Sequence, residues 1–90
     1  MKSCCCLFYD IYNLQSIDLS LFNTQNVTNM SYMFKNCNNL PRIDLSLFNT
    51  QKVTYMEDMF YNCDKLGSIV INIKSSNITN WIKKGKIIYA

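Results

Sequence analysis

Two aspartates and two serines recur at a spacing that could bring carboxylates together. Asp18 and Ser20 return 26 residues later as Asp44 and Ser46, in the same Ile-Asp-Leu-Ser sequence. If these residues lie on the outer face of neighbouring strands, the two carboxylates repel each other unless a cation or a basic partner lies between them. Alternatively, each Asp accepts a hydrogen bond within the turn that follows it. Two carboxylates supply too few ligands for a calcium site, so we expect no metal and favour the turn hydrogen bond. The four residues are also candidates for contact with a protein partner.

A second group of candidates is aromatic and acidic. Tyr32, Tyr55, Asp58 and Tyr61 fall on the solvent side of the helices predicted below. Exposed tyrosines often anchor protein interfaces, but a small protein also exposes aromatic residues because it lacks the volume to bury them. With the previous four residues, these form the set of candidate partner-binding residues.

The five cysteines show no metal-binding spacing, and the chain has no histidine. Cys4, Cys5 and Cys6 are adjacent, without the two-residue gap that presents a pair of thiolates to zinc. We expect Cys4 to pack in the core, and an exposed reactive or acylated cluster is the alternative. Cys37 and Cys63 occupy equivalent positions on predicted neighbouring helices, about 8 to 10 Å apart. Because a disulfide needs Cα atoms within about 7 Å, both are predicted to be buried thiols.

Catalytic chemistry is not expected. Without histidine, and with two glycines in all, the chain lacks the usual bases, triads and glycine-rich phosphate loops. The sequence therefore predicts neither an enzyme nor a cofactor. The net charge of +3 is mild and comes largely from Lys83, Lys84 and Lys86, so nucleic-acid binding is not expected either.

The elements that position these residues follow from a period of 26. Residues 14–39 and 40–65 are identical at 17 of 26 positions. Ile17, Leu19 and Leu21 alternate with polar residues, which predicts a strand over 17–21 with these aliphatics toward the core. Its copies lie at 43–47 and 69–73 and would pair in parallel. Apolar residues at steps of three and four predict a helix over 27–37 and again over 53–63, the latter starting with a Thr54 and Glu57 capping box.

The whole chain is then one domain of 90 residues. We divide it into the tail of a preceding repeat (1–13), repeat 1 (14–39), repeat 2 (40–65), a degenerate capping repeat (66–85) whose helix ends near Gly85, and a tail (86–90). The predicted fold class is an α/β repeat solenoid with short parallel strands on one side and short helices on the other.

A family resemblance supports this prediction. The run Leu-x-x-Ile-Asp-Leu-Ser-x-Phe-Asn-Thr-x-x-Val-Thr-x-Met-x-x-Met-Phe-x-Asn-Cys, at 14–37 and 40–63, resembles the BspA-like leucine-rich repeats of bacterial surface proteins and lipoproteins. The resemblance implies a solenoid at the cell surface or secreted, used for adhesion or for binding host or matrix proteins. It supplies no catalytic residues, and the chain shows no signal peptide or anchor.

The function expected from these observations is non-catalytic protein–protein interaction through one face of the solenoid, with an unidentified protein partner. The alternative is a structural spacer, or a truncated fragment of a longer repeat array, without a binding surface of its own. No segment is long and apolar enough to span a membrane. The strand predicted over 17–21 would be an unpaired edge, so self-association through the open N-terminal end is also expected.

Overall fold

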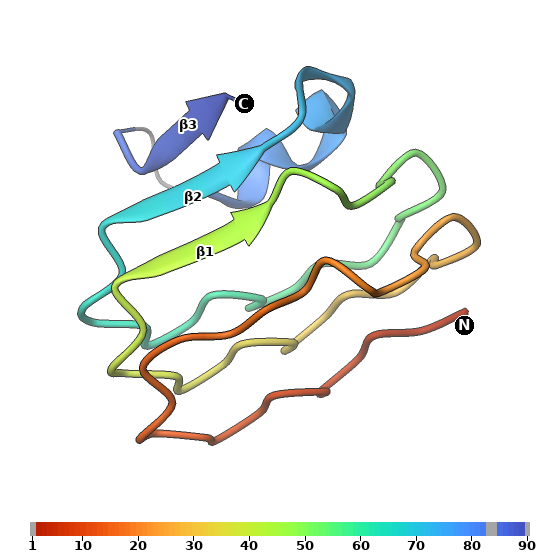
Figure 1. Ribbon diagram of the computed structural model, residues 1–90. Helices are drawn as coiled ribbons and strands as arrows, with labels where there is room; N and C mark the ends of the chain where they lie inside the picture. The colour runs from red at the N-terminus through yellow and green to blue at the C-terminus, as the bar shows by residue number, and fades with distance from the viewer. Residues whose placement is uncertain (1, 83–84, 90) are drawn as a thin grey trace.

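A computed structural model describes residues 2–82 and 85–89 of the chain. Its regular elements are three short strands and one 3-10 helix: β1 (Arg42–Leu45), β2 (Ser68–Ile71), η1 (Ile73–Trp81) and β3 (Ile87–Tyr89). The strands run parallel in one open sheet of order β1-β2-β3 (Figure 1). The molecule measures 29 × 24 × 23 Å along its principal axes, so the described chain is compact rather than elongated.

The sheet contributes one wall of the core. Ile43 pairs with Ile69 and Leu45 with Ile71 in the register of β1 and β2, and all four side chains are buried. Asp44 lies between the two buried residues of β1 and is exposed, as the alternation of a strand with one solvent face requires.

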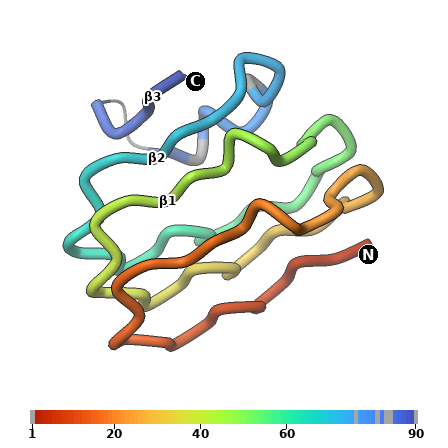
Figure 2. Tube along the Cα trace, viewed as in Figure 1, coloured from red at the N-terminus to blue at the C-terminus, as the bar shows by residue number. Residues whose placement is uncertain are grey.

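The opposite wall consists of three segments that we call the first (3–10), second (29–36) and third (55–62) turn segments. They lie side by side in parallel, as Figures 1 and 2 show, with bridges that join Ser3 to Asn29 and Asn29 to Tyr55. In the second segment every second backbone N–H donates to a carbonyl of the third: Met30 to Tyr55 (2.7 Å), Tyr32 to Glu57 (3.0 Å), Phe34 to Met59 (2.9 Å) and Asn36 to Tyr61 (2.8 Å). The first segment donates to the second in the same way.

The remaining amides of each turn segment bond locally. Met33 and Lys35 donate to the carbonyls three residues earlier, Met30 and Tyr32. Every fourth residue has a positive φ: Cys6, Asp10, Tyr32, Asn36, Asp58 and Asn62. An α-helix needs an unbroken run of right-handed residues with bonds to the carbonyl four residues earlier, and this backbone has neither.

The helices predicted over 27–37 and 53–63 are therefore wrong, although their apolar face was predicted correctly. Val27, Met30, Met33, Phe34 and Cys37 are all fully buried. The predicted fold class, an α/β repeat solenoid with strands on one side and helices on the other, is wrong because the described residues contain no α-helix and only three strands in one open sheet.

Three smaller predictions also fail. Residues 17–21 form no strand, and β1 and β2 end before the third aliphatic residue of each predicted strand. The capping box is absent, because Glu57 accepts from the Ser31 hydroxyl (2.9 Å) instead of returning to Thr54. In the last region η1 ends at Trp81 rather than near Gly85. The subdivision at residues 13, 39, 65 and 85 stays a prediction, and Lys83 and Lys84 lie outside the described residues.

Equivalent side chains on the three turn segments contact one another. Phe8, Phe34 and Phe60 stack with ring centroids 5.4 and 5.8 Å apart and planes within 13°. Beside them the Asn62 amide donates to Asn36 (3.0 Å), and Asn36 donates to the Asp10 carboxylate. Each column holds the segments in register, because a slip would separate like side chains.

We expect Asn36→Ala to lower the free energy of unfolding by about 1 to 3 kcal/mol. The substitution removes two side-chain hydrogen bonds, and at φ 65° alanine tolerates the left-handed backbone less well than asparagine does. Urea unfolding measures the change. Asn36→Gly relieves the backbone cost and should lose less, whereas Asn13→Ala, at an exposed position, should be nearly neutral. Equal stability of Asn36→Ala and the unmodified chain would contradict the role given to this column.

Candidate functional site

The first candidate surface is a shallow groove of about 240 Å³ beside β1, here called the Asp groove. It is lined by Ile17, Asp18, Leu19, Ser20, Arg42, Asp44, Ser46 and Leu47. The structure thus brings together Asp18, Ser20, Asp44 and Ser46, the four residues that the sequence selected from this part of the repeat.

The two aspartates of the groove act as turn acceptors. The backbone N–H of Ser20 donates to Asp18 and that of Ser46 to Asp44, both at 2.9 Å. Hydrogen bonds from the serine hydroxyls and from these backbone N–H groups hold the pKa of both carboxyls below the usual value, and Arg42 lowers the pKa of Asp44 further. Of the two alternatives drawn from the sequence, the structure shows the turn hydrogen bond, which needs no bound cation.

Large aliphatic side chains lie in the open next to these turns. Leu21 is 95% exposed, Leu47 68% and Ile73 72%, although the strand pattern predicted them in the core. The backbone turns directly after β1, where the Phe48 N–H donates to the Leu45 carbonyl (3.0 Å), and this turn directs Phe48 inward in place of Leu47. The signal in the sequence was the adjacent Leu-Phe pair, since neighbours in an extended chain cannot both face the same side.

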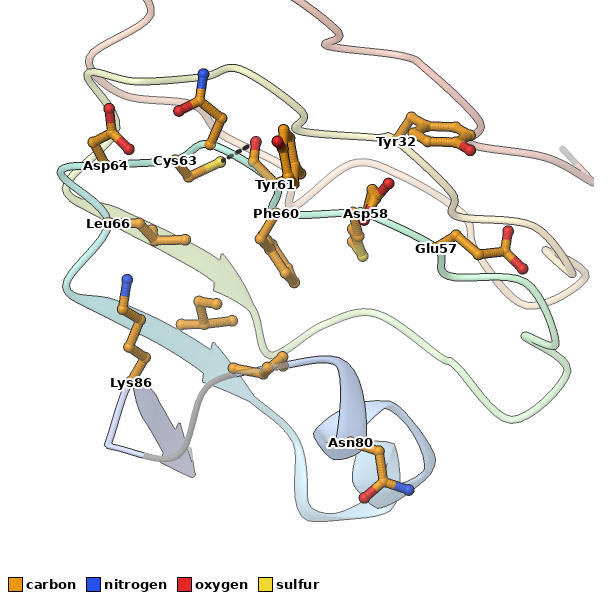
Figure 3. Close-up of a pocket in the computed structure, with 14 residues that line it drawn as sticks. Tyr32, Glu57, Asp58, Phe60, Tyr61, Cys63, Asp64, Leu66, Asn80 and Lys86 are labelled. Carbon is orange, nitrogen blue, oxygen red and sulfur yellow. Dashed lines mark hydrogen bonds between the residues drawn. The ribbon is translucent and has the colours of Figure 1, made fainter.

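A second candidate surface is a cleft of about 750 Å³ between the third turn segment and the C-terminal residues, here called the C-terminal cleft (Figure 3). Tyr32, Asp58 and Tyr61 from the sequence-derived set line it, whereas Tyr55 is exposed outside its lining. Further lining residues were not among the candidates identified from the sequence, including Glu57, Phe60, Asp64, Asn80 and Lys86. The last two come from a region where the repeat has decayed, so the period gave no signal for them.

The side chain of Lys35 lies close to three tyrosine rings near this cleft. The Lys35 ammonium lies 5.7 Å from the ring centre of Tyr9, 5.3 Å from that of Tyr32 and 5.4 Å from that of Tyr61. Tyr9 and Tyr61 are the equivalents of Lys35 in the neighbouring turn segments. These aromatic faces therefore attract a cation, at distances where such contacts contribute about 0.5 to 1 kcal/mol each at exposed sites.

The cysteines divide into buried and exposed thiols. Cys4, Cys37 and Cys63 are buried, whereas Cys5 and Cys6 are exposed. The thiols of Cys37 and Cys63 donate to the carbonyls of Phe8 (3.1 Å) and Phe34 (3.0 Å). The prediction that both are buried thiols outside any disulfide is confirmed. Burial raises the pKa of both, that of Cys63 to about 11.

The described residues offer neither a metal centre nor a membrane span. Over residues 2–82 and 85–89, no three histidine, cysteine or carboxylate side chains are grouped so that they could hold a metal ion. Within the same residues, no helix has the length and apolarity that crossing a bilayer requires.

The raised pKa of Cys63 predicts a loss of stability in alkali. Its pKa in the folded chain lies above the ordinary value of 9.0, so the neutral thiol stabilises the fold below pH 9, and this contribution disappears as the pH rises toward 11. Denaturant unfolding from pH 8 to 11 should show a steeper fall for the unmodified chain than for Cys63→Ala. Parallel curves for the two proteins would exclude Cys63 as a source of the effect.

Comparisons with known proteins identify one family. No curated protein and no solved structure matches the chain. A family model described as "Mycoplasma protein of unknown function, DUF285" matches residues 2–86. This family is not the BspA-like leucine-rich repeats, so the resemblance inferred from residues 14–37 and 40–63 was wrong, and the adhesion role that it implied loses its support. Because the match extends over nearly the entire sequence, the chain belongs to the family of Mycoplasma proteins of unknown function, DUF285.

Proposed function

We propose that the chain is a non-catalytic module that binds another protein through the Asp groove and the aliphatic side chains exposed beside it. The observation that carries this proposal is the exposure of Leu21, Leu47 and Ile73, which lie 26 residues apart in the chain. Leaving such side chains in water forgoes about 1.5 to 3 kcal/mol each that burial would provide. A partner that covers them recovers this free energy.

The surroundings of these residues have the composition of a protein interface. Leu47 and Ile17 line the groove together with Asp18, Arg42 and Asp44, so apolar contact area is bordered by charges of both signs. Interfaces commonly combine an apolar centre with a polar rim that determines orientation. The carboxylates are already fixed by their turn hydrogen bonds, so a partner would meet them preorganised and pay little for ordering them.

Binding without catalysis agrees with the use of these polar groups. Asp18 and Asp44 accept from the turns, and Glu57 accepts from Ser31, which joins two turn segments. These carboxylates serve the backbone and the register of the fold. Location at the cell surface or outside the cell came from the overturned resemblance and stays an untested prediction.

A second copy of the chain is the alternative partner. In the first turn segment the carbonyls of Ser3, Cys5, Leu7 and Tyr9 occupy the positions that accept hydrogen bonds in the second segment, and no described residue donates to them. An edge of this kind can pair with another chain. Self-association through residues 3–10 therefore remains part of the proposal.

The test is a photo-crosslinking amino acid placed at Leu47, with Gln51 as the matched exposed control outside the Asp groove. We expect a specific protein to crosslink from position 47 and not from 51. The purified partner should bind the chain about tenfold more weakly after Leu21→Ser and Leu47→Ser, a loss of about 1.4 kcal/mol.

Two outcomes would contradict the proposal. One is the absence of a specific crosslink from position 47, which favours the structural spacer. The other is a partner whose affinity is unchanged by both serine substitutions. Sedimentation velocity on the unmodified chain identifies the second-copy alternative, because self-association then depends on protein concentration.

A further inference from the structure

The third turn segment has backbone N–H groups for which the described residues, 2–82 and 85–89, offer no acceptor. Its N–H groups at Met56, Asp58, Phe60 and Asn62 are equivalent to those of Met30, Tyr32, Phe34 and Asn36, which all donate to the next segment. No described residue accepts from them. The C-terminal cleft lies along this edge: residues 57–64 form one wall, and Asn80, Ile82 and Lys86 belong to the other. The cleft is where a fourth parallel segment would lie.

The side chains of this edge specify what such a segment would carry. Phe60 stacks on Phe34 at 5.8 Å with planes 3° apart, is only partly buried, and projects into the cleft in Figure 3. Phe34 itself has a ring on each side, Phe8 and Phe60. A further aromatic ring over Phe60 would continue this stack with the offset geometry that aromatic pairs prefer.

The residue after the aromatic ring would be a cation. In the second segment Phe34 is followed by Lys35, whose ammonium lies 5.7 Å from Tyr9 and 5.4 Å from Tyr61. Tyr61 follows Phe60 and also lines the cleft. A segment stacked on the third one, with Phe over Phe60, therefore places its next side chain beside Tyr61, where a lysine or arginine repeats the existing contact.

The charge of the cleft favours the same occupant. Its described lining contains three carboxylates, those of Glu57, Asp58 and Asp64, and one ammonium, that of Lys86. A segment with a basic residue is attracted to this lining, and an acidic segment is repelled.

We propose that the C-terminal cleft binds one extended segment of a partner protein that runs parallel to residues 55–62 and contains an aromatic residue followed directly by lysine or arginine. The segment accepts hydrogen bonds from Met56, Asp58, Phe60 and Asn62, so it adds one strand-like layer to an open edge. This inference rests on the proposed protein-binding function but concerns a surface separate from the Asp groove.

A single segment fits better than a whole second copy. In the sheet, β3 already pairs with the side of β2 that faces away from β1. The position beyond β2 is therefore occupied, whereas no described residue pairs with the outer edge of the third turn segment. A complete copy stacked in register would bring its residues 17–21 against β3. A single peptide segment lacks the equivalent of residues 17–21 and therefore does not meet β3.

The probe is a synthetic peptide of residues 28–39 of this chain, carrying Cys37→Ser to prevent oxidation. It contains Phe34 and Lys35 in the required order and forms the equivalent layer within the fold. We titrate the peptide into the full chain and follow the amide resonances by NMR. The resonances of Asp58, Phe60 and Asn62 should shift and reach saturation. Peptides with Phe34→Ala or Lys35→Glu should bind about tenfold more weakly or not at all.

Protein variants locate the site. Tyr61→Ser, at an exposed position in the cleft, should weaken the peptide several-fold, whereas Tyr55→Ser, equally exposed outside the cleft lining, should not. The proposal is overturned if millimolar peptide leaves the amides of 56–62 unshifted, if Lys35→Glu binds equally well, or if the shifts fall on residues 3–9. It is also overturned if those amides shift with protein concentration alone, which would identify a second copy as the occupant.

The result separates the two proposals. Failure of the peptide with a specific crosslink from Leu47 would overturn the cleft and leave the Asp groove. Binding of the peptide without any crosslink from Leu47 would do the reverse.

Discussion

The fold depends on backbone hydrogen bonds that run between turn segments at every second residue. In the second segment, alternate N–H groups leave the segment and bond to the third at 2.7 to 3.0 Å, while the intervening ones close local turns. This arrangement provides hydrogen-bond partners for the buried backbone N–H and C=O groups without an α-helix or a wide sheet. A core as small as this one could not enclose either of those elements. Its cost is a residue with positive φ at every fourth position. Asparagine and aspartate at Asp10, Asn36, Asp58 and Asn62 reduce this cost because they tolerate the left-handed conformation.

Register is maintained by like side chains. The phenylalanine stack through Phe34 and the amide column through Asn36 both repeat at the spacing of the turn segments. Apolar stacking and side-chain hydrogen bonds therefore act on the same register as the backbone bonds. The backbone turns also determine which side chains reach the surface. At the turn that follows β1, Phe48 is buried and Leu47 is exposed. Where no described residue pairs with the outer edge of the third turn segment, the C-terminal cleft lies open.

The sequence predicted the core better than the backbone. Apolar residues at steps of three and four identified Val27, Met30, Phe34 and Cys37 as buried, because side-chain burial depends on spacing. The same spacing fits a helix and a series of turns, and the choice between them depends on acceptors 25 residues away that local propensity does not represent. Asn36 and Asn62 were the residues in the sequence that indicated turns, since asparagine is common in turns and tolerates the left-handed backbone that both adopt.

The candidate sites were predicted in part for similar reasons. The recurring Ile-Asp-Leu-Ser run gave the Asp groove, because repetition brings equivalent residues together. The repetition did not predict Arg42 as part of the Asp groove, because the other copy has no basic residue at the equivalent position. It did not predict Lys86 as part of the C-terminal cleft either, because Lys86 lies beyond the regular period. Glu57 was assigned to a helix cap from its local sequence, whereas its partner Ser31 lies on a neighbouring segment.

Amide hydrogen exchange measured residue by residue tests the backbone arrangement most directly. The arrangement predicts slow exchange at Met30, Tyr32, Phe34 and Asn36, which donate between segments, and much faster exchange at their equivalents Met56, Asp58, Phe60 and Asn62, which have no acceptor among the described residues. The contrast should hold even though Met56 is buried. Equal protection of the two sets, or uniform protection through residues 31–37 as in a helix, would contradict it.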